Sequence, residues 1–194
     1  NLVASQLEKA GVKPDDITVM IQSHTHIDHI GGLADFPNVP IVIADAERAL
    51  PRPIYWEQAQ PIEWPDQTYI LITEDREIGP GFEVLLVPGH APGQLAMRIV
   101  LPETGHVLLT SDAISRPAEI TEKFAGSWDQ ALACHHGARL VEIYAQIHLL
   151  ARPSTSLRRL ALGIRSVAGQ WIIDGAVDSL MHAVRGDALA LREC

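Results

Sequence analysis

The sequence predicts an α/β sandwich, a fold in which sheets and helices pack as layers, and three observations lead to it. Apolar runs at 82–87, 95–101 and 106–110 are separated by turns containing proline or glycine, as expected for strands. Apolar residues recur at helical spacing over 2–10 and 127–146. The chain has 194 residues and is 47% apolar, which is enough for one domain with a buried core.

The first part of the chain alternates expected strands and helices. The helix over 2–10 ends at Gly11, a common helix stop. The run "ITVMIQS" at 17–23 predicts a buried strand, and "VPIVIADAERAL" at 39–50 predicts a strand followed by a helix. Residues 51–68 are rich in proline, tryptophan and glutamine and predict a long irregular loop.

Composition and charge exclude several classes of partner. The formal net charge is −9 and the pI is near 5.4, which argues against a nucleic-acid partner. No apolar run reaches the roughly 18 residues of a membrane span, so we expect no membrane partner. Cys134 and Cys194 are too few for a disulfide framework, and no leader peptide is visible at the first residues. The expected location is therefore cytoplasmic.

Four side chains that commonly bind metals are crowded into one turn after the expected strand at 17–23. The stretch "SHTHIDHIGG" contains His24, His26, Asp28 and His29 within six positions. Imidazole nitrogens and a carboxylate oxygen suit zinc or iron. Alternate side chains of an extended segment point the same way, so His24 and His26 can reach one ion. Asp28 and His29, past the bend, can turn toward a second ion.

Two further candidate ligands directly follow expected strands. His90 lies in "VPGHAPG", where glycine and proline favour a tight loop, and Asp112 lies in "LLTSDAI". Binding sites gather in loops at strand ends in layered α/β folds. We therefore expect His90 and Asp112 to join the histidines of the first motif.

Taken in this order, "SHTHIDHIGG", "VPGHAPG" and "LLTSDA" resemble the metallo-β-lactamase superfamily of dinuclear metallohydrolases. Their spacing is similar to that of the N-acyl homoserine lactone lactonases. The resemblance covers residues 1–144 and implies a four-layer αββα sandwich with the metals at one edge of two packed sheets. The opening strands of that sandwich have no counterpart here. We therefore expect an N-terminally truncated hydrolase domain at 1–144 and an atypical tail at 145–194.

The resemblance implies two divalent metal ions, zinc first, with iron or manganese as alternatives. The implied ligands are imidazole or carboxylate side chains: His24, His26 and His90 for the first ion, Asp28 and His29 for the second, and Asp112 as the bridge between both.

The implied function is a metal-dependent hydrolase that cleaves an ester-like bond of a small-molecule substrate, a lactone first, with a metal-bound hydroxide. Asp28 would pass a proton to the leaving oxygen. Three alternatives stay open: a thioesterase of the glyoxalase II type, an iron-dependent oxidoreductase similar to persulfide dioxygenases, and a catalytically inactive remnant. Diiron relatives tend to carry glutamate where this chain has His26. Ser115 stands where lactonases often carry a tyrosine that polarises the substrate carbonyl.

The tail at 145–194 differs from the rest of the chain. Its net charge is +2 against −11 over 1–144, and all its basic residues are arginine. A shifted reading frame beginning near residue 145, or a helical extension, would explain this composition. The resemblance implies a final ligand histidine in a Gly-His turn, and the tail has no such turn. His148 and His182 are the nearest candidates, and both are more typical of helix faces.

Other conspicuous side chains have structural interpretations beside functional ones. Tyr55, Trp56 and Trp64 in the long loop can pack it onto the body of the protein or cover an apolar acyl chain. The pair His135 and His136 lies within the expected helix and is predicted to be solvated.

Overall fold

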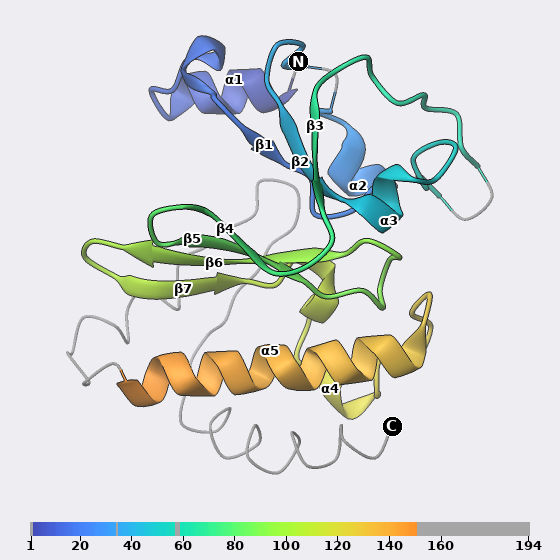
Figure 1. Ribbon diagram of the computed structural model, residues 1–194, viewed down its shortest axis with the longest axis vertical. Helices are drawn as coiled ribbons and strands as arrows, with labels where there is room; N and C mark the ends of the chain where they lie inside the picture. The colour runs from blue at the N-terminus through green and yellow to red at the C-terminus, as the bar shows by residue number, and fades with distance from the viewer. Residues whose placement is uncertain (1, 34, 57–58, 151–194) are drawn as a thin grey trace.

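The structure is a computed structural model that describes residues 2–33, 35–56 and 59–150. These residues form two β-sheets with helices on their outer sides (Figure 1). The first sheet is parallel, in the order β1-β2-β3, and consists of β1 (Met20–Ile21), β2 (Ile41–Ala44) and β3 (Tyr69–Ile72). The second is antiparallel, in the order β4-β5-β6-β7, and consists of β4 (Arg76–Gly79), β5 (Phe82–Leu86), β6 (Leu95–Leu101) and β7 (Gly105–Leu109).

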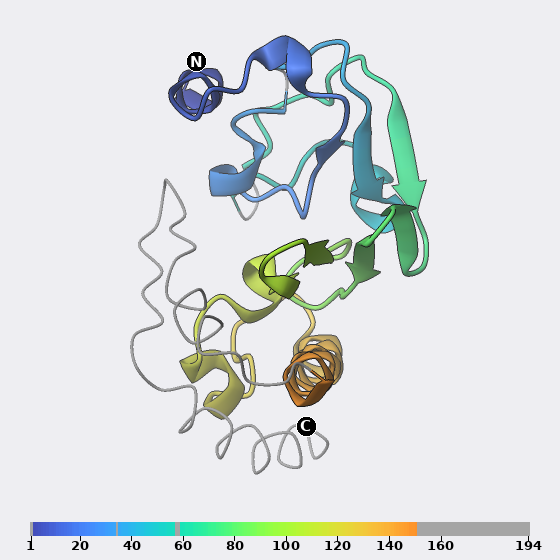
Figure 2. The same cartoon turned by 90° about the vertical axis from the view of Figure 1, so that its left-hand side faces the viewer.

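The helices are short except for the last. In chain order they are α1 (Leu2–Lys9), the 3-10 helix η1 (Pro14–Asp16), α2 (Ile27–Ile30), α3 (Asp45–Arg48), the 3-10 helix η2 (Ser111–Ile114), α4 (Ala118–Thr121) and α5 (Gln130–Leu150). Figures 1 and 2 show α5 along the second sheet, on the side away from the first sheet. No helix among the described residues is long and apolar enough to cross a membrane.

The central core lies between the two sheets. Its buried residues come from β2, β3, β5 and β6 and are Val42, Ala44, Ile72, Val84 and Leu95. Successive side chains of a strand point to opposite faces, so one face of each sheet can supply this layer. Burial of these apolar side chains stabilises the packing of sheet on sheet, at about 1.5–3 kcal/mol for each large one.

The outer faces of the sheets are buried as well. The other face of β2 packs Ile41 and Ile43 against Ile30 and Leu33 of the α2 segment, so all four residues of β2 are buried. On the second sheet, Leu85 packs in one cluster with Leu140 of α5. Helix, sheet, sheet and helix therefore form four layers, and the predicted αββα sandwich is confirmed.

Most of the expected elements occur with small shifts. β6 has the predicted bounds, β5 ends one residue earlier than predicted, and β7 is shifted by one residue toward the N-terminus. The last helix begins at Gln130 rather than residue 127, because Asp129 caps it: Asp129 Oδ1 accepts a hydrogen bond from the Leu132 N–H at 3.0 Å. α1 ends near Gly11, whose φ of +79° suits glycine.

The strand predicted over 17–23 is wrong in length, because only Met20–Ile21 pair as β1. The Gln22 N–H still donates to Val42 O at 2.9 Å, but the side-chain amide of Gln22 then bonds the carbonyls of His24 and His29. These bonds bend the chain away from the sheet and into the histidine turn.

The long loop before β3 has no helix among its described residues. Trp64 packs it onto the body: its Nε1 donates to Leu50 O at 2.8 Å, and the Arg48 guanidinium lies 4.8 Å from the centre of the ring. Tyr55 is partly buried against the outer core of the first sheet. Trp56 is 60% exposed, so the packing interpretation fits Trp64 and Tyr55 and leaves Trp56 at the surface.

The prediction that both His135 and His136 are solvated is wrong for one of them. His135 is exposed, whereas His136 is partly buried and its Nδ1 has no hydrogen-bond partner among the described residues. Burial, with the neighbouring His135 and Arg139, lowers the pKa of His136 to about 4 from 6.5. The imidazole is therefore neutral in the folded state at neutral pH.

This lowered pKa makes stability depend on pH. Between pH 6.5 and 4 the unfolded chain binds a proton at His136 that the folded chain does not, so stability falls as pH falls through this window. His136→Asn is expected to reduce that loss by about 1–2 kcal/mol, less than the full shift because solvent screens the ring. Urea unfolding of metal-free protein at pH 7 and pH 4 measures it, with exposed His106→Asn as the control. Equal pH dependence in both variants would contradict the prediction.

The tail lies largely outside the described residues, which end at 150. His182 lies outside them. Position 148 falls in the last turn of α5, and its side chain is also outside the described part.

Candidate metal centre

Five of the six predicted ligand side chains converge where three loops meet. They form two overlapping sets, His24, His26 and His90, and His24, His29 and Asp112, in each of which the possible ligand atoms lie within 4.8 Å of one another. The loops follow β1, β5 and β7, so the first comes from one sheet and the others from the second sheet. The prediction that His90 and Asp112 lie beside the first motif holds in the structure.

His24 belongs to both sets and is the most deeply placed. It is 0% exposed, and its Nε2 has no hydrogen-bond partner among the described residues. Burial, together with the neighbouring His29, His90 and His26, lowers the pKa of His24 to about 2. A neutral buried imidazole with an unused nitrogen, facing a carboxylate and other imidazoles, has the chemistry of a ligand to a divalent cation.

His26 and His90 bring ring nitrogens together from distant parts of the chain. His26 Nδ1 lies 2.9 Å from His90 Nε2, across 64 residues of sequence. His26 precedes α2 with extended backbone, and its side chain makes no capping hydrogen bond to that helix. Burial lowers the pKa of both imidazoles. Both imidazoles are therefore neutral near neutral pH, with one ring nitrogen of each available to a metal, as ligation requires.

Asp112 supplies the carboxylate that faces the histidines. Its Oδ2 lies 3.4 Å from His29 Nε2, 3.5 Å from His90 Nε2 and 3.8 Å from His24 Nε2. Burial would raise the pKa of Asp112, but the hydrogen bond and charge interaction with His29 outweigh it and lower that pKa. Conversely, burial lowers the pKa of His29, and the same interactions outweigh it and raise that pKa.

The structure places Asp28 at the rim of the cluster. Its side chain is 66% exposed, and it belongs to neither set of close ligand atoms. Asp28 lies in the first turn of α2, and its Oδ2 is 3.5 Å from His29 Nε2. Asp28 therefore lies beside His29 on the solvent side of the cluster.

The loops are held by polar residues that the motifs did not indicate. Gln22 is 4% exposed, and its amide donates to the carbonyls of His24 and His29, which closes the turn between them. The Leu95 N–H donates to Ser23 O at 2.8 Å, joining the start of β6 to this turn. Glu47 of α3 is also fully buried beside the turn. In the sequence, Gln22 and Glu47 differ from other polar residues only in that they lie in or beside an apolar run.

Gly89 sets the position of the His90 loop. Its φ is +144°, and a Cβ added there would lie 2.4 Å from the backbone of Ala133 in α5. The Asp129 N–H also donates to Gly89 O at 2.9 Å. Only glycine allows α5 to approach the loop this closely.

Replacing Gly89 by alanine is therefore expected to destabilise the protein by about 2–3 kcal/mol and to weaken metal binding, because His90 must move with the loop. Urea unfolding and a zinc titration measure the two effects. Gly79→Ala is the matched control, since a Cβ at Gly79 meets nothing within 4 Å. Equal stability and zinc affinity in the two variants would refute the expectation.

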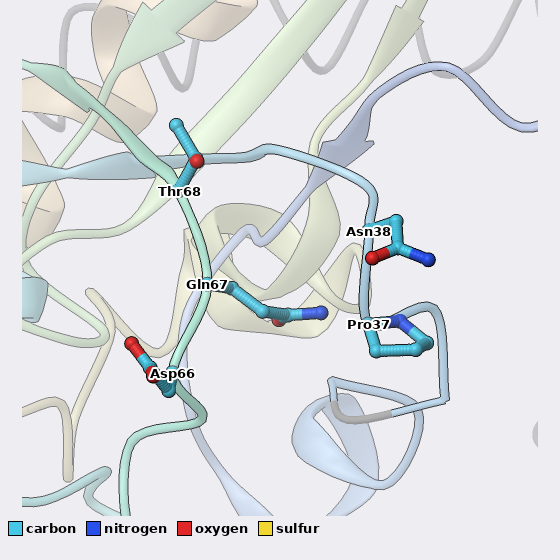
Figure 3. Close-up of a pocket in the computed structure, with 5 residues that line it drawn as sticks. All are labelled: Pro37, Asn38, Asp66, Gln67 and Thr68. Atoms are coloured by element: carbon cyan, nitrogen blue, oxygen red, sulfur yellow. The ribbon is translucent and has the colours of Figure 1, made fainter.

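A separate polar pocket of about 380 Å³ lies at the start of β3 (Figure 3). Its lining consists of Pro37, Asn38, Asp66, Gln67 and Thr68. It includes none of the predicted ligands, and Asp66 is its one ionisable side chain. The candidate metal ligands therefore lie at the histidine cluster and not in this pocket.

Two packed sheets, with a histidine and aspartate cluster at the loops that follow their strands, define a four-layer sandwich with a candidate metal centre at one edge. A family model described as the metallo-beta-lactamase superfamily matches residues 2–161. The chain belongs to this superfamily, and the resemblance found in the sequence is confirmed.

The sequence relatives of this chain include N-acyl homoserine lactonases. An N-acyl homoserine lactonase from Bacillus thuringiensis is 36% identical over 145 residues, covering 73% of this chain and 56% of the relative. One from Bacillus cereus is 37% identical over 145 residues, with the same coverage. The chain thus spans little more than half the length of the curated relatives that it matches.

Solved structures give the same result. The structure of an N-acyl homoserine lactone hydrolase with the product N-hexanoyl-L-homoserine bound at its catalytic metal centre has a TM-score of 0.63 and 34% identity, covering 75% of this chain and 58% of that one. A dizinc quorum-quenching lactonase, AidC, has a TM-score of 0.56 at 22% identity, covering 74% and 58%. At 22% identity, the similarity to AidC is a similarity of fold alone.

Proposed function

We propose that this chain forms the catalytic part of a metal-dependent hydrolase that opens the ring of a small lactone, an N-acyl homoserine lactone first. The observation that carries the proposal is the convergence of five ligand-type side chains from three loops. The lactonase relatives, at 36–37% identity, support the substrate class.

The proposed cofactors are two zinc ions. Imidazole nitrogens and carboxylate oxygens are ligands that zinc prefers, and the unpartnered Nε2 of buried His24 fits such an ion. When bound, the ions would supply Lewis acidity and lower the pKa of coordinated water. His24, His26 and His90 would hold the first ion. His29, Asp112 and, from the rim, Asp28 would hold the second, with Asp112 facing both.

The other residues act on the substrate and its protons. Asp28, exposed at the rim, can take a proton and pass it to the leaving oxygen of the opened ring. Ser115 cannot replace a phenol that polarises the substrate carbonyl, because its hydroxyl and its N–H both donate to the carboxylate of Glu119. Because this departure removes a lactone-directing group, a thioester is the second substrate to test.

The domain division is part of the proposal. Residues 1–144 would carry the site and 145–194 would form a separate tail, although α5 continues to Leu150 and the family match to residue 161. If the tail supplies no metal ligand, the second ion would be bound more weakly than the first. The substrate would be a small molecule met in the cytoplasm.

Hydrolysis in the presence and absence of a chelator tests the function. Ring opening produces a carboxylic acid, so a pH indicator follows turnover of N-hexanoyl homoserine lactone. Activity is expected to vanish in excess chelator and to return with added zinc. A thioester substrate assayed in parallel identifies the second candidate. Full turnover in excess chelator would overturn the proposal, and no turnover of either substrate with zinc present would support an inactive remnant.

A further inference from the structure

Glu47 is a fully buried carboxylate that the proposed chemistry does not use. It is 0% exposed and lies in α3, directly after the buried strand β2. Its Oε1 accepts hydrogen bonds from the Thr25 N–H at 2.8 Å and the Thr25 hydroxyl at 2.6 Å. Its Oε2 accepts from the Gly93 N–H at 3.0 Å. An ionised group is costly to bury unless it is compensated in this way.

These three bonds join the two loops that carry the first ligand set. Thr25 stands between His24 and His26, and Gly93 lies three positions after His90. The Thr25 hydroxyl also accepts from the Ile54 N–H at 2.9 Å, so its own proton is directed to Glu47. One side chain therefore ties the backbone between His24 and His26 to the loop that carries His90.

The loop of His90 is shaped to reach this carboxylate. A Cβ added at Gly93 would lie 2.4 Å from Glu47 Cβ, 2.6 Å from Glu47 N and 2.8 Å from Ala44 Cβ. No residue with a Cβ could bring its N–H so near without a shift of the backbone. Both oxygens of Glu47 are occupied by donors, and Glu47 belongs to neither set of close ligand atoms.

We infer that Glu47 is a positioning residue of the metal centre, which holds the His24–His26 turn and the His90 loop at the spacing that lets their imidazoles reach one ion. The inference rests on the proposed metal centre. Groups that orient ligands typically change metal affinity by 10–100-fold when they are replaced. A glutamine at this position has one acceptor oxygen, so its NH₂ must face the N–H of either Thr25 or Gly93.

Metal binding by the full chain, without substrate, tests the inference. Zinc affinity is measured by competition with a coloured chelator, and cobalt(II) is added in place of zinc to record its visible spectrum. Glu47→Gln is expected to bind zinc about 10–100-fold more weakly and to change the cobalt bands, which report ligand geometry. A purely structural role would lower stability and leave those bands unchanged.

Asp75→Asn is the matched control. Asp75 is also a carboxylate that ties two segments, because it accepts from the Leu86 N–H at 3.0 Å and pairs with Arg139 of α5. It lies before β4 and belongs to neither set of candidate ligand atoms. Its replacement is expected to lower the unfolding temperature while zinc affinity and the cobalt spectrum stay as in the unaltered chain.

The outcomes separate the two hypotheses. Unaltered zinc affinity and cobalt bands in Glu47→Gln would overturn the positioning role and leave the metal centre standing. Failure of the unaltered chain to bind cobalt would overturn the proposed function itself. If Glu47→Gln does not fold, Glu47→Asp gives the same test, since a carboxylate one methylene shorter cannot reach both Thr25 and Gly93. Unaltered binding in that variant would equally overturn the inference.

Discussion

Asp112→Ala is expected to lose both metal ions and to lower the rate of lactone hydrolysis by about 10³-fold or more. The carboxylate oxygen of Asp112 lies within 3.8 Å of three imidazole nitrogens, and the two ligand sets each contribute to these three histidines. Its removal leaves each ion with fewer ligands, and metal ions contribute several kcal/mol to such reactions. Elemental analysis of dialysed protein gives the metal content, and the indicator assay gives the rate.

Asp66→Ala is the control for the Asp112 variant. Asp66 is an exposed carboxylate in the separate pocket of Figure 3, and its replacement should leave two ions and full activity. If Asp112→Ala still bound two ions tightly, the bridging role of Asp112 would be wrong.

Asp28→Asn is expected to lower kcat by about 10²–10⁴-fold while the first ion stays bound. Asp28 is 66% exposed and stands outside both ligand sets, so an amide there removes a proton carrier without opening the His24, His26 and His90 site. Steady-state kinetics should show the loss mainly in kcat. Metal analysis on the same sample gives the occupancy of both sites.

Asp45→Asn is the matched control for this second variant. Asp45 is exposed in the first turn of α3, as Asp28 is in the first turn of α2, so both substitutions remove the same charge from the start of a four-residue helix. Asp45→Asn should leave kcat unchanged. Loss of both ions from Asp28→Asn would instead make Asp28 a principal ligand, and unchanged kcat would remove it from the chemistry.

The sequence predicted the parts of the fold that local pattern determines. β6 was found with its bounds because Leu95–Leu101 is an apolar run, interrupted only by Arg98, between turn residues. β1 was expected too long, since nothing in "ITVMIQS" shows that the side chain of Gln22 would bond the next turn. β3 and β4 were not expected, because Tyr69–Ile72 is an apolar run of only four residues and Arg76–Gly79 contains one large apolar side chain, Ile78.

The same division holds for the site. His24, His26 and His29 could be found because they share one turn, and His90 and Asp112 because each follows a strand. Glu47 and Gln22 could not be found in this way. The partners of Glu47 are a backbone N–H and a hydroxyl 22 residues away and another N–H 46 residues away. Only the packing of both sheets brings these groups together.

The pairing of His26 with His90 has a consequence for the stability of the protein in a cell. The two imidazoles come from loops of different sheets, so an ion held between them fastens one half of the sandwich to the other. Separation of the halves would release that ion. By mass action, free metal at about 1,000 times its dissociation constant adds about 4 kcal/mol to the free energy of unfolding. The fraction of chains that survive proteolysis would then rise and fall with the supply of metal.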